Sequence, residues 1–372
     1  MPDRRPDFAN LRRTLLRSGP PGPVPFIELF IDPGLIQAVL GESVCWDPLL
    51  AGDWSSSEGA AALRAALDAL LRFCRQQAYD YVWGWTGLRF PRANFNLATD
   101  SAATANWLSG ARFWQDETSG PIQTWADFEA FPWPKAEHIS YGALEHLDRM
   151  LPDGMKISVN IGGIFEESSW LMGLQSFAYA LHDQPELVAA ICQRVGDLAT
   201  AAARNAAAID GVGLVFLGDD LGHAGGTLVS PQVLRQHIFP HYRRMVEAVH
   251  AAGKLLLLHS CGNLARIMDE LVEIGFDAKH SYEDKIMPVE EVHRRWGDRI
   301  AILGGVDMDL LTRGSEDDVR MRTRSILETC AAAGTGYCLG TGNSGANYVV
   351  PRNFLAMLDE GRRWNRAHFP HA

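Results

Sequence analysis

The chain has 372 residues, and 45 acidic side chains against 34 Lys and Arg give a formal net charge of −11. This charge argues against non-specific binding to nucleic acid, which needs a basic surface. A hydrophobic fraction of 47% supports a large core and excludes global disorder. The N-terminal residues lack the apolar core of a secretory signal, no apolar run has the ~18 residues of a membrane span, and the six cysteines are scattered. We therefore expect a cytoplasmic protein with reduced thiols that contacts no membrane.

Eight short segments, apolar or β-branched, follow one another along the chain, and most of them end in Gly, Asp or Asn. The first is 24–30, after a basic N-terminal arm of residues 1–22. The other seven are 79–87, 155–163, 213–222, 254–260, 277–283, 300–307 and 335–343. Such segments, bounded by turn residues, are typical of buried strands.

Segments with helical periodicity separate most of these strands, namely 59–77, 230–253, 264–275, 316–334 and 350–364. The alternation favours an α/β fold, a (β/α)8 TIM barrel, over an open doubly wound sheet, because no GxGxxG turn follows a strand. Residues 88–150 are rich in Trp, Phe and Pro and are predicted to be a lid or insertion after strand 2. The whole chain, residues 1–372, is then one barrel domain.

Polar side chains concentrate where the predicted strands end, which in such a barrel is the mouth that carries the chemistry. Burying polar groups costs free energy unless they are paired, so a shared polar site is the economical interpretation. Predicted substrate-binding residues are Glu28, Trp83, Trp85, Asn160, His223, His280, Asp307 and Asn343. Structural roles compete for some of them, since core packing is the favoured role for one Trp, and a structural or solvent-facing position is favoured over a ligand role for His223 and His280.

The strongest constellation is His259, Cys261 and Cys338. Residues i and i+2 of an extended segment share a face, so His259 and Cys261 can bind one ion, and Cys338 on the last strand can add a thiolate. One imidazole and two thiolates suit Zn²⁺ with a fourth position open. The alternatives are a His259–Cys261 hydrogen bond without metal, and a Cys338 that only packs in its strand.

Two adjacent aspartates, Asp219 and Asp220, lie in the "GDD" at 218–220, near the end of the predicted strand 213–222. One of them fits a helix N-cap. The other is expected to face the mouth as a catalytic acid or base, a metal ligand or a substrate anchor.

From about residue 150 onward the chain resembles the uroporphyrinogen decarboxylase superfamily. The resemblance is carried by "GDDLG", "KLLLLHSCGN", "GFDAKHSYED", "ILGGVDMDLL" and "GTGNSGANYVVPRNFLAML". It implies a TIM barrel and one of two activities. The decarboxylases use no metal and hold their polycarboxylate substrate with an arginine-rich "MRQAGR" segment, where this chain has "VPFIELFIDPG".

The other branch, the cobamide-dependent methyltransferases, binds zinc through His-x-Cys and a later Cys, and His259 and Cys261 match the first two residues. When this chain is aligned with that branch on "TGNSGANYVVP", the position of the third zinc ligand falls on Thr341 or Gly342 instead of Cys338. Glu28 and Asp219 are the alternatives to Cys338 as the third ligand.

The resemblance therefore implies a zinc-dependent methyltransferase that moves a methyl group between a small substrate, methoxylated or thiol, and a corrinoid on a partner protein. A homodimer is compatible with the sequence. One alternative is a metal-free decarboxylase, for which Arg89, Arg92 and Arg112 are the candidate anchors. The other is a non-catalytic barrel that binds a corrinoid or tetrapyrrole.

Overall fold

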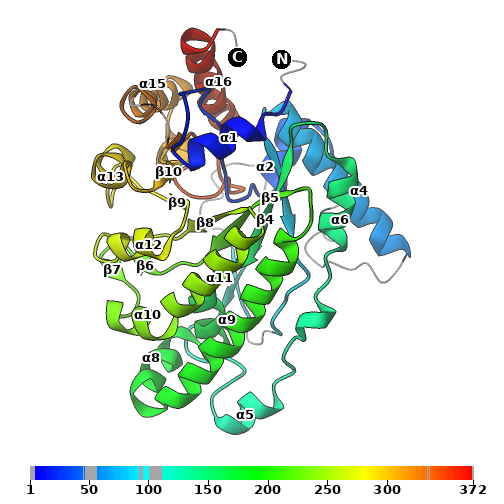
Figure 1. The fold of residues 1–372 in the computed structure, drawn as a ribbon, viewed down its shortest axis with the longest axis vertical. Coiled ribbons are helices and arrows are strands. Elements are labelled where there is room, and N and C mark those ends of the chain that lie inside the picture. Colours follow the sequence, from blue (N-terminus) through cyan, green and yellow to red (C-terminus); the bar gives the residue numbers. More distant parts are fainter. Residues whose placement is uncertain are drawn as a thin grey trace.

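The computed structural model describes residues 5–44, 46, 57–91, 95–99, 111–332, 334 and 336–370 (Figure 1). Within them, parallel strands form one curled seven-stranded sheet in the order β1-β4-β5-β8-β9-β10-β11. Its strands are β1 (Tyr81–Trp85), β4 (Lys156–Gly162), β5 (Val212–Gly218), β8 (Leu255–His259), β9 (Ala278–His280), β10 (Ala301–Leu303) and β11 (Tyr337–Cys338). Six of them lie inside their predicted segments and β5 begins one residue before its segment, and the architecture is TIM-like.

The barrel is not closed by a continuous ladder, because the predicted first strand, 24–30, is an extended segment rather than a strand. It pairs with the segment after β11 through one parallel bridge, between Phe26 and Leu339. On the other side it meets β1 through side chains, since the Tyr81 hydroxyl and the Trp83 indole N–H both donate to the Glu28 carbonyl. Pro25 has no backbone N–H for a ladder. The prediction of eight regular strands was therefore wrong by one.

Helices pack around the outside of the sheet (Figure 1). They include α4 (Ser57–Gln76), α9 (Pro185–Ala207), α11 (Phe239–Ala251), α12 (Met268–Ile274), α13 (Val289–Trp296), α15 (Glu316–Ile326) and α16 (Pro351–His368). The single helix predicted over 230–253 is two, since α10 (Pro231–His237) ends at Ile238 before α11. Pro240 explains the break, because its ring would clash with the carbonyl four residues earlier. None of the described helices is both long and apolar enough to cross a membrane.

The N-terminal arm closes the end of the sheet where the strands begin. Its helix α1 (Phe8–Leu15) buries Leu11 and Leu15 completely. The Phe8 backbone N–H donates to the Gly154 carbonyl just before β4, and its ring lies where a Cβ on Gly213, in β5, would collide with it. The opposite end, where the strands finish, is left for the site.

The segment between β1 and β4 adds a small layer to the barrel. It contains the antiparallel pair β2 (Phe95–Thr99) and β3 (Ala111–Gln115), then α5 (Trp125–Ala130). Phe90, Phe128 and Phe131 surround Trp133, with ring centroids 4.7–6.3 Å apart. The last part, α6 (Gly142–Met150), packs on α4, β1 and β4 as a barrel helix does.

A buried carboxylate ties two neighbouring strand ends together. Asp219, directly after β5, accepts hydrogen bonds from the first three backbone N–H groups of α7 (Ile164–Met172), at 2.7–2.9 Å. It also accepts one from the Tyr242 hydroxyl, at 2.6 Å, and is fully buried. A side chain on Gly163 would collide with this carboxylate, so glycine is required there. Asp219, predicted as a catalytic residue, therefore caps a helix, the role expected of one of the two aspartates, and its oxygens are already occupied by these donors.

We expect Asp219→Ala to lower the free energy of unfolding by about 4 kcal/mol or more, because it leaves four buried donors unpaired at about 1–3 kcal/mol each. Asp307→Ala is the matched control. Asp307 caps α14 (Met308–Arg313) through two N–H groups at a less buried position, so its loss costs about 1 kcal/mol. Urea unfolding measures both, and equal losses would contradict the anchoring role of Asp219.

Candidate active site

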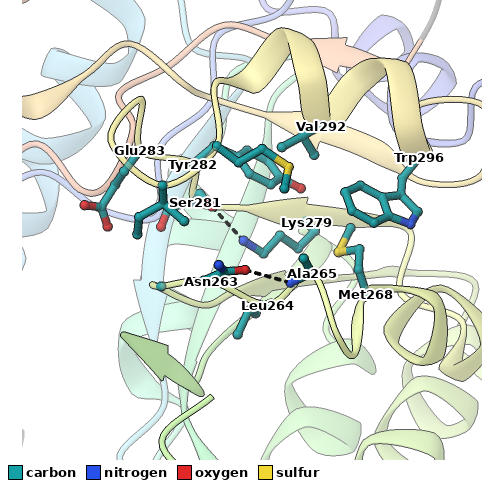
Figure 2. Close-up of a pocket in the computed structure, with 13 residues that line it drawn as sticks. Asn263, Leu264, Ala265, Met268, Lys279, Ser281, Tyr282, Glu283, Val292 and Trp296 are labelled. Carbon is teal, nitrogen blue, oxygen red and sulfur yellow. Dashed lines mark hydrogen bonds between the residues drawn. The ribbon is translucent and has the colours of Figure 1, made fainter. Parts of the chain in front are cut away.

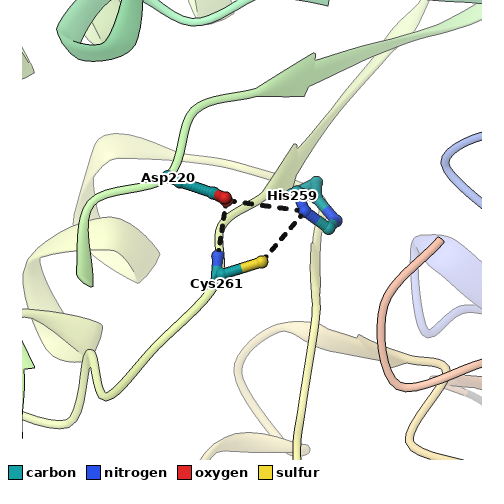
Figure 3. Close-up of side chains that lie close together, drawn as sticks. All are labelled: Asp220, His259 and Cys261. Atoms are coloured by element: carbon teal, nitrogen blue, oxygen red, sulfur yellow. Dashed lines mark hydrogen bonds and ion pairs between the residues drawn. The ribbon is translucent and has the colours of Figure 1, made fainter. Parts of the chain in front are cut away.

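Three potential metal ligands meet at the carboxyl ends of β5 and β8: Asp220, His259 and Cys261 (Figure 3). Their ligand atoms all lie within 4.8 Å of one another. His259 Nε2 is 3.5 Å from both Cys261 Sγ and Asp220 Oδ1. The Cys261 backbone N–H holds that aspartate oxygen in place at 2.8 Å. The predicted sharing of one face by His259 and Cys261 is thus confirmed.

The hydrogen bonds behind the cluster fix which nitrogen of His259 faces it. His280 Nε2 is 2.9 Å from the Thr341 carbonyl, which can only accept, so this nitrogen carries the proton. His280 Nδ1 is then the acceptor for His259 Nδ1–H, 2.8 Å away. Burial lowers the pKa of His259 to about 3, so the ring is neutral. Its Nε2 therefore presents a free lone pair to Asp220 and Cys261.

The sulfur of Cys261 sits among donors on its other side. The Asn343 amide donates to it at 3.2 Å and the Ser281 hydroxyl at 3.7 Å. Burial, and then the nearby Asp220, raise the pKa of the thiol above its ordinary value. A cation in the cluster would lower the pKa of the Cys261 thiol, because it stabilises the thiolate.

The chemistry of this donor set fits a divalent cation. The lone pair of His259 Nε2 faces a carboxylate oxygen of Asp220 at 3.5 Å, and among the described residues the Cys261 thiol is the one donor available between them. Two hydrogen-bond acceptors at this distance repel each other unless a cation or a proton lies between them. Nitrogen, sulfur and oxygen are all zinc ligands, and three protein ligands leave a fourth position for substrate. The N–H of His259 that points away is hydrogen-bonded, as in most metal-binding histidines.

Cys338 is not part of this cluster. Cys338 is fully buried in β11, three residues before Thr341. The charged group near enough to affect the pKa of its thiol is Asp80, directly before β1. Cys338 therefore lies too early in its strand to reach the mouth. The structure thus does not bring Cys338, predicted as the third ligand, to His259 and Cys261, whereas among the described residues Asp220 lies beside them.

A cavity of about 790 Å³ opens beside the cluster. Its described lining includes Asp220, His259 and Asn343 from the cluster side and the aromatic rings of Phe30, Trp85, Phe90 and Trp170. Asn160 lines it as well, with its Nδ2 donating to the Leu29 carbonyl while its Oδ1 has no partner. Trp85, Asn160 and Asn343 thus lie where the sequence predicts substrate-binding residues.

The other predicted substrate-binding residues lie elsewhere. Glu28 and Trp83 are completely buried and do not line the cavity, and His280 stands behind His259. His223 is exposed, with its ring accepting a hydrogen bond from Gly225 N–H, and Asp307 caps α14. These were strand ends whose side chains turn away from the mouth.

A second cavity lies on the outer side of β9, behind Ser281 (Figure 2). At about 30 Å³ it is too small for an organic substrate. Lys279 lies in it with its ammonium 2.6 Å from the Ser281 carbonyl and 4.2 Å from the centre of the Tyr282 ring. Burial lowers the pKa of Lys279 to about 8. This lysine holds the turn that presents Ser281 to Cys261.

Glu166 and Glu167 were missed by sequence reasoning. Both lie in the first turn of α7 and line the large cavity beside Asp220. Burial, with Asp220 and Asp219 as further causes, raises the pKa of Glu166 well above its ordinary value. Two consecutive acids, separated by two residues from the glycines that end a strand, were the available signal.

Comparisons with known proteins agree with this architecture. Over 95% of this chain and 98% of the other, the structure superposes on a methyltransferase from Methanosarcina mazei, with a TM-score of 0.68 and 16% identity. A GH27 β-L-arabinopyranosidase from Geobacillus stearothermophilus aligns with 95% of this chain and 78% of its own, but with a TM-score of 0.41 and 10% identity. A comparison with curated proteins gives no match.

At 16% identity the first likeness establishes the fold, and the second is too distant to carry an argument. The family model described as "Uroporphyrinogen decarboxylase (URO-D)" matches residues 117–364, which include Asp220, His259, Cys261 and all the strands from β4 onward. The chain therefore belongs to the uroporphyrinogen decarboxylase family.

Proposed function

We infer that this protein is a zinc-dependent methyltransferase that exchanges a methyl group between a small substrate and the cobalt of a corrinoid on a separate protein. One observation carries the proposal: His259, Cys261 and Asp220 converge at the strand ends with an unprotonated Nε2 between a sulfur and a carboxylate. The methyltransferase from Methanosarcina mazei, with which the chain shares its fold, supports this branch of the family.

In this function His259 Nε2, Cys261 Sγ and a carboxylate oxygen of Asp220 would hold the ion. Zinc so bound supplies a Lewis acid that polarises a substrate oxygen, or lowers the pKa of a substrate thiol. The residues around it prepare the site. His280 keeps Nε2 of His259 free, while Asn343 and Ser281 stabilise negative charge on the sulfur.

The large cavity selects the substrate by charge and shape. The carboxyl groups of Glu166, Glu167 and Asp220 line its wall, with burial favouring the neutral form of Glu166, whereas Arg89 is the sole cation among its described lining residues. Aromatic rings such as Trp85 and Trp170 offer flat apolar surface, and the free Oδ1 of Asn160 accepts a hydrogen bond. A neutral methylated compound, such as a methoxylated aromatic, suits this lining better than a polyanion.

The same lining argues against the metal-free decarboxylase. A porphyrinogen-like polycarboxylate would meet a single cation among the described lining residues, Arg89, whose guanidinium already donates to the carbonyls of Thr86 and Leu88. Arg92 lies outside the described residues, and nothing is described of the Arg112 side chain. A non-catalytic barrel would have no need of a cluster arranged for a cation.

Purified protein is expected to bind one zinc per chain, and Cys261→Ala, His259→Ala and Asp220→Ala each to weaken binding by at least about 100-fold, because two ligands rarely retain zinc. Cys338→Ala is the matched control and keeps the affinity of the wild type. Competition with a chromophoric chelator measures these affinities. Loss of zinc in Cys338→Ala with retention in Asp220→Ala would contradict the ligand assignment.

Methyl transfer to free cob(I)alamin, from a panel of methoxylated aromatic compounds and methyl thioethers, tests the activity through the change in corrinoid absorbance. We expect turnover with zinc, loss on chelation and recovery when zinc is restored. Cys261→Ala should fall to background, whereas Cys338→Ala keeps its rate. Decarboxylation of a porphyrinogen by the metal-free protein would establish the alternative instead, and corrinoid binding without turnover of any donor would favour the non-catalytic barrel.

A further inference from the structure

One residue, Thr341, joins the two sides of the metal cluster. Its carbonyl accepts the proton of His280 Nε2, which sets the orientation of His259. Its hydroxyl lies 2.6 Å from the carbonyl of Asn343, whose side chain donates to Cys261. Any displacement of Thr341 therefore reaches both the imidazole and the sulfur.

Thr341 is itself held by Glu28, a completely buried residue that does not line the large cavity. The Thr341 backbone N–H donates to Glu28 Oε1 at 2.8 Å, and the Thr341 hydroxyl lies 2.5 Å from Glu28 Oε2. These contacts bridge the extended segment 24–30 and the segment after β11, where one backbone bridge pairs the two.

The two short contacts of the Thr341 hydroxyl decide the protonation of Glu28. The hydroxyl has one proton, and it lies within hydrogen-bond distance of two oxygens, Glu28 Oε2 and the Asn343 carbonyl. A carbonyl cannot donate, so the Thr341 proton must go to Asn343 if both contacts are hydrogen bonds. The proton of the other contact then comes from Glu28, and the carboxyl is neutral.

The surroundings of Glu28 agree with a neutral carboxyl. Burial raises its pKa to about 8. The titratable groups that face it are Tyr79 before β1 and Tyr81 on β1, with Cys338 on β11 next to Tyr81. Burial raises the pKa of all three well above their ordinary values, so none of these described groups carries charge at neutral pH.

We propose that Glu28, held protonated, is a positioning residue for the metal cluster, acting through Thr341 on His259 by way of His280 and on Cys261 by way of Asn343. The role rests on the proposed function, since it concerns the same cluster. Glu28 touches neither substrate nor metal. It supplies a hydrogen-bond donor that an ionised carboxylate lacks, and a glutamine at this position keeps such a donor.

Zinc affinity of the intact protein separates this role from a general structural one. Glu28→Ala is expected to bind zinc about 10–100-fold more weakly, as loss of an outer partner of a metal ligand does, whereas Glu28→Gln stays within about threefold of the wild type. Thr341→Val removes only the hydroxyl and is expected to fall between them, which keeps the test decisive if Glu28→Ala does not fold. Equal affinities in all variants would overturn the proposal, and a wild type that binds no zinc would overturn the proposed function alone.

The histidine tautomers give a readout that requires no metal. In the metal-free wild type, ¹⁵N–¹H correlation spectra should show His259 protonated at Nδ1 and His280 at Nε2, with each ring assigned by its own substitution. Glu28→Gln should keep this pattern, and Thr341→Val or Glu28→Ala should mix the tautomers. The positioning role of Glu28 would be refuted by protonation of His259 at Nε2 in the wild type. It would also be refuted if the tautomers of both histidines stayed the same in every variant.

The protonation of Glu28 can be tested through stability. Because the folded pKa is raised from 4.5 to about 8, the folded state holds a proton that the unfolded state releases between these values. The wild type should therefore lose stability relative to Glu28→Gln as the pH rises from about 4.5 to about 8, by roughly 10²–10³-fold in the unfolding equilibrium constant. A ratio that stays constant with pH, measured by urea unfolding, would show that Glu28 is ionised in the folded protein.

Discussion

The register of three neighbouring parallel strands is the constraint on which the site depends. Gly218 of β5 pairs with His259 of β8, and His259 pairs with His280 of β9. Parallel pairing places the two imidazoles side by side at the same level of the sheet, where His259 Nδ1–H donates a hydrogen bond to His280 Nδ1. A shift of one residue would turn His259 to the other face of the sheet and leave Asp220 and Cys261 without their nitrogen.

The two adjacent aspartates at the end of β5 have different roles, because their side chains point in opposite directions. Asp219 turns toward α7 and meets four donors, while Asp220, one residue later, turns toward His259 and Cys261. Successive residues of an extended segment point to opposite sides, so one carboxylate anchors the scaffold and the next one serves the site. The anchor also places the first turn of α7, and with it Glu166, next to Asp220.

The sequence could predict what depends on local pattern. Apolar runs that end in polar residues located all seven strands of the sheet, and His259 with Cys261 followed from alternation within one segment. The sequence could not predict which of the polar residues near a strand end lie far enough along the strand to reach the mouth of the barrel. Cys338 stops three residues short of the level of Thr341, and His223 and Asp307 pass into surface turns or helix caps. The choice between Asp219 and Asp220 needed the positions of α7 and Tyr242, which belong to distant parts of the chain.

On the proposed function, a carboxylate in place of a second thiolate changes the chemistry of the centre. Thiolate sulfur donates more electron density to zinc than a carboxylate oxygen does, so a His-Cys-Asp set leaves the ion a stronger Lewis acid than a His-Cys-Cys set. Asn343 and Ser281, which donate to Cys261 Sγ, draw charge from the one sulfur that remains. The same site is therefore less suited to activating a thiol as a nucleophile and better suited to polarising a methylated oxygen. The aromatic, acid-lined cavity beside it points in the same direction, toward removal of a methyl group from an uncharged ether.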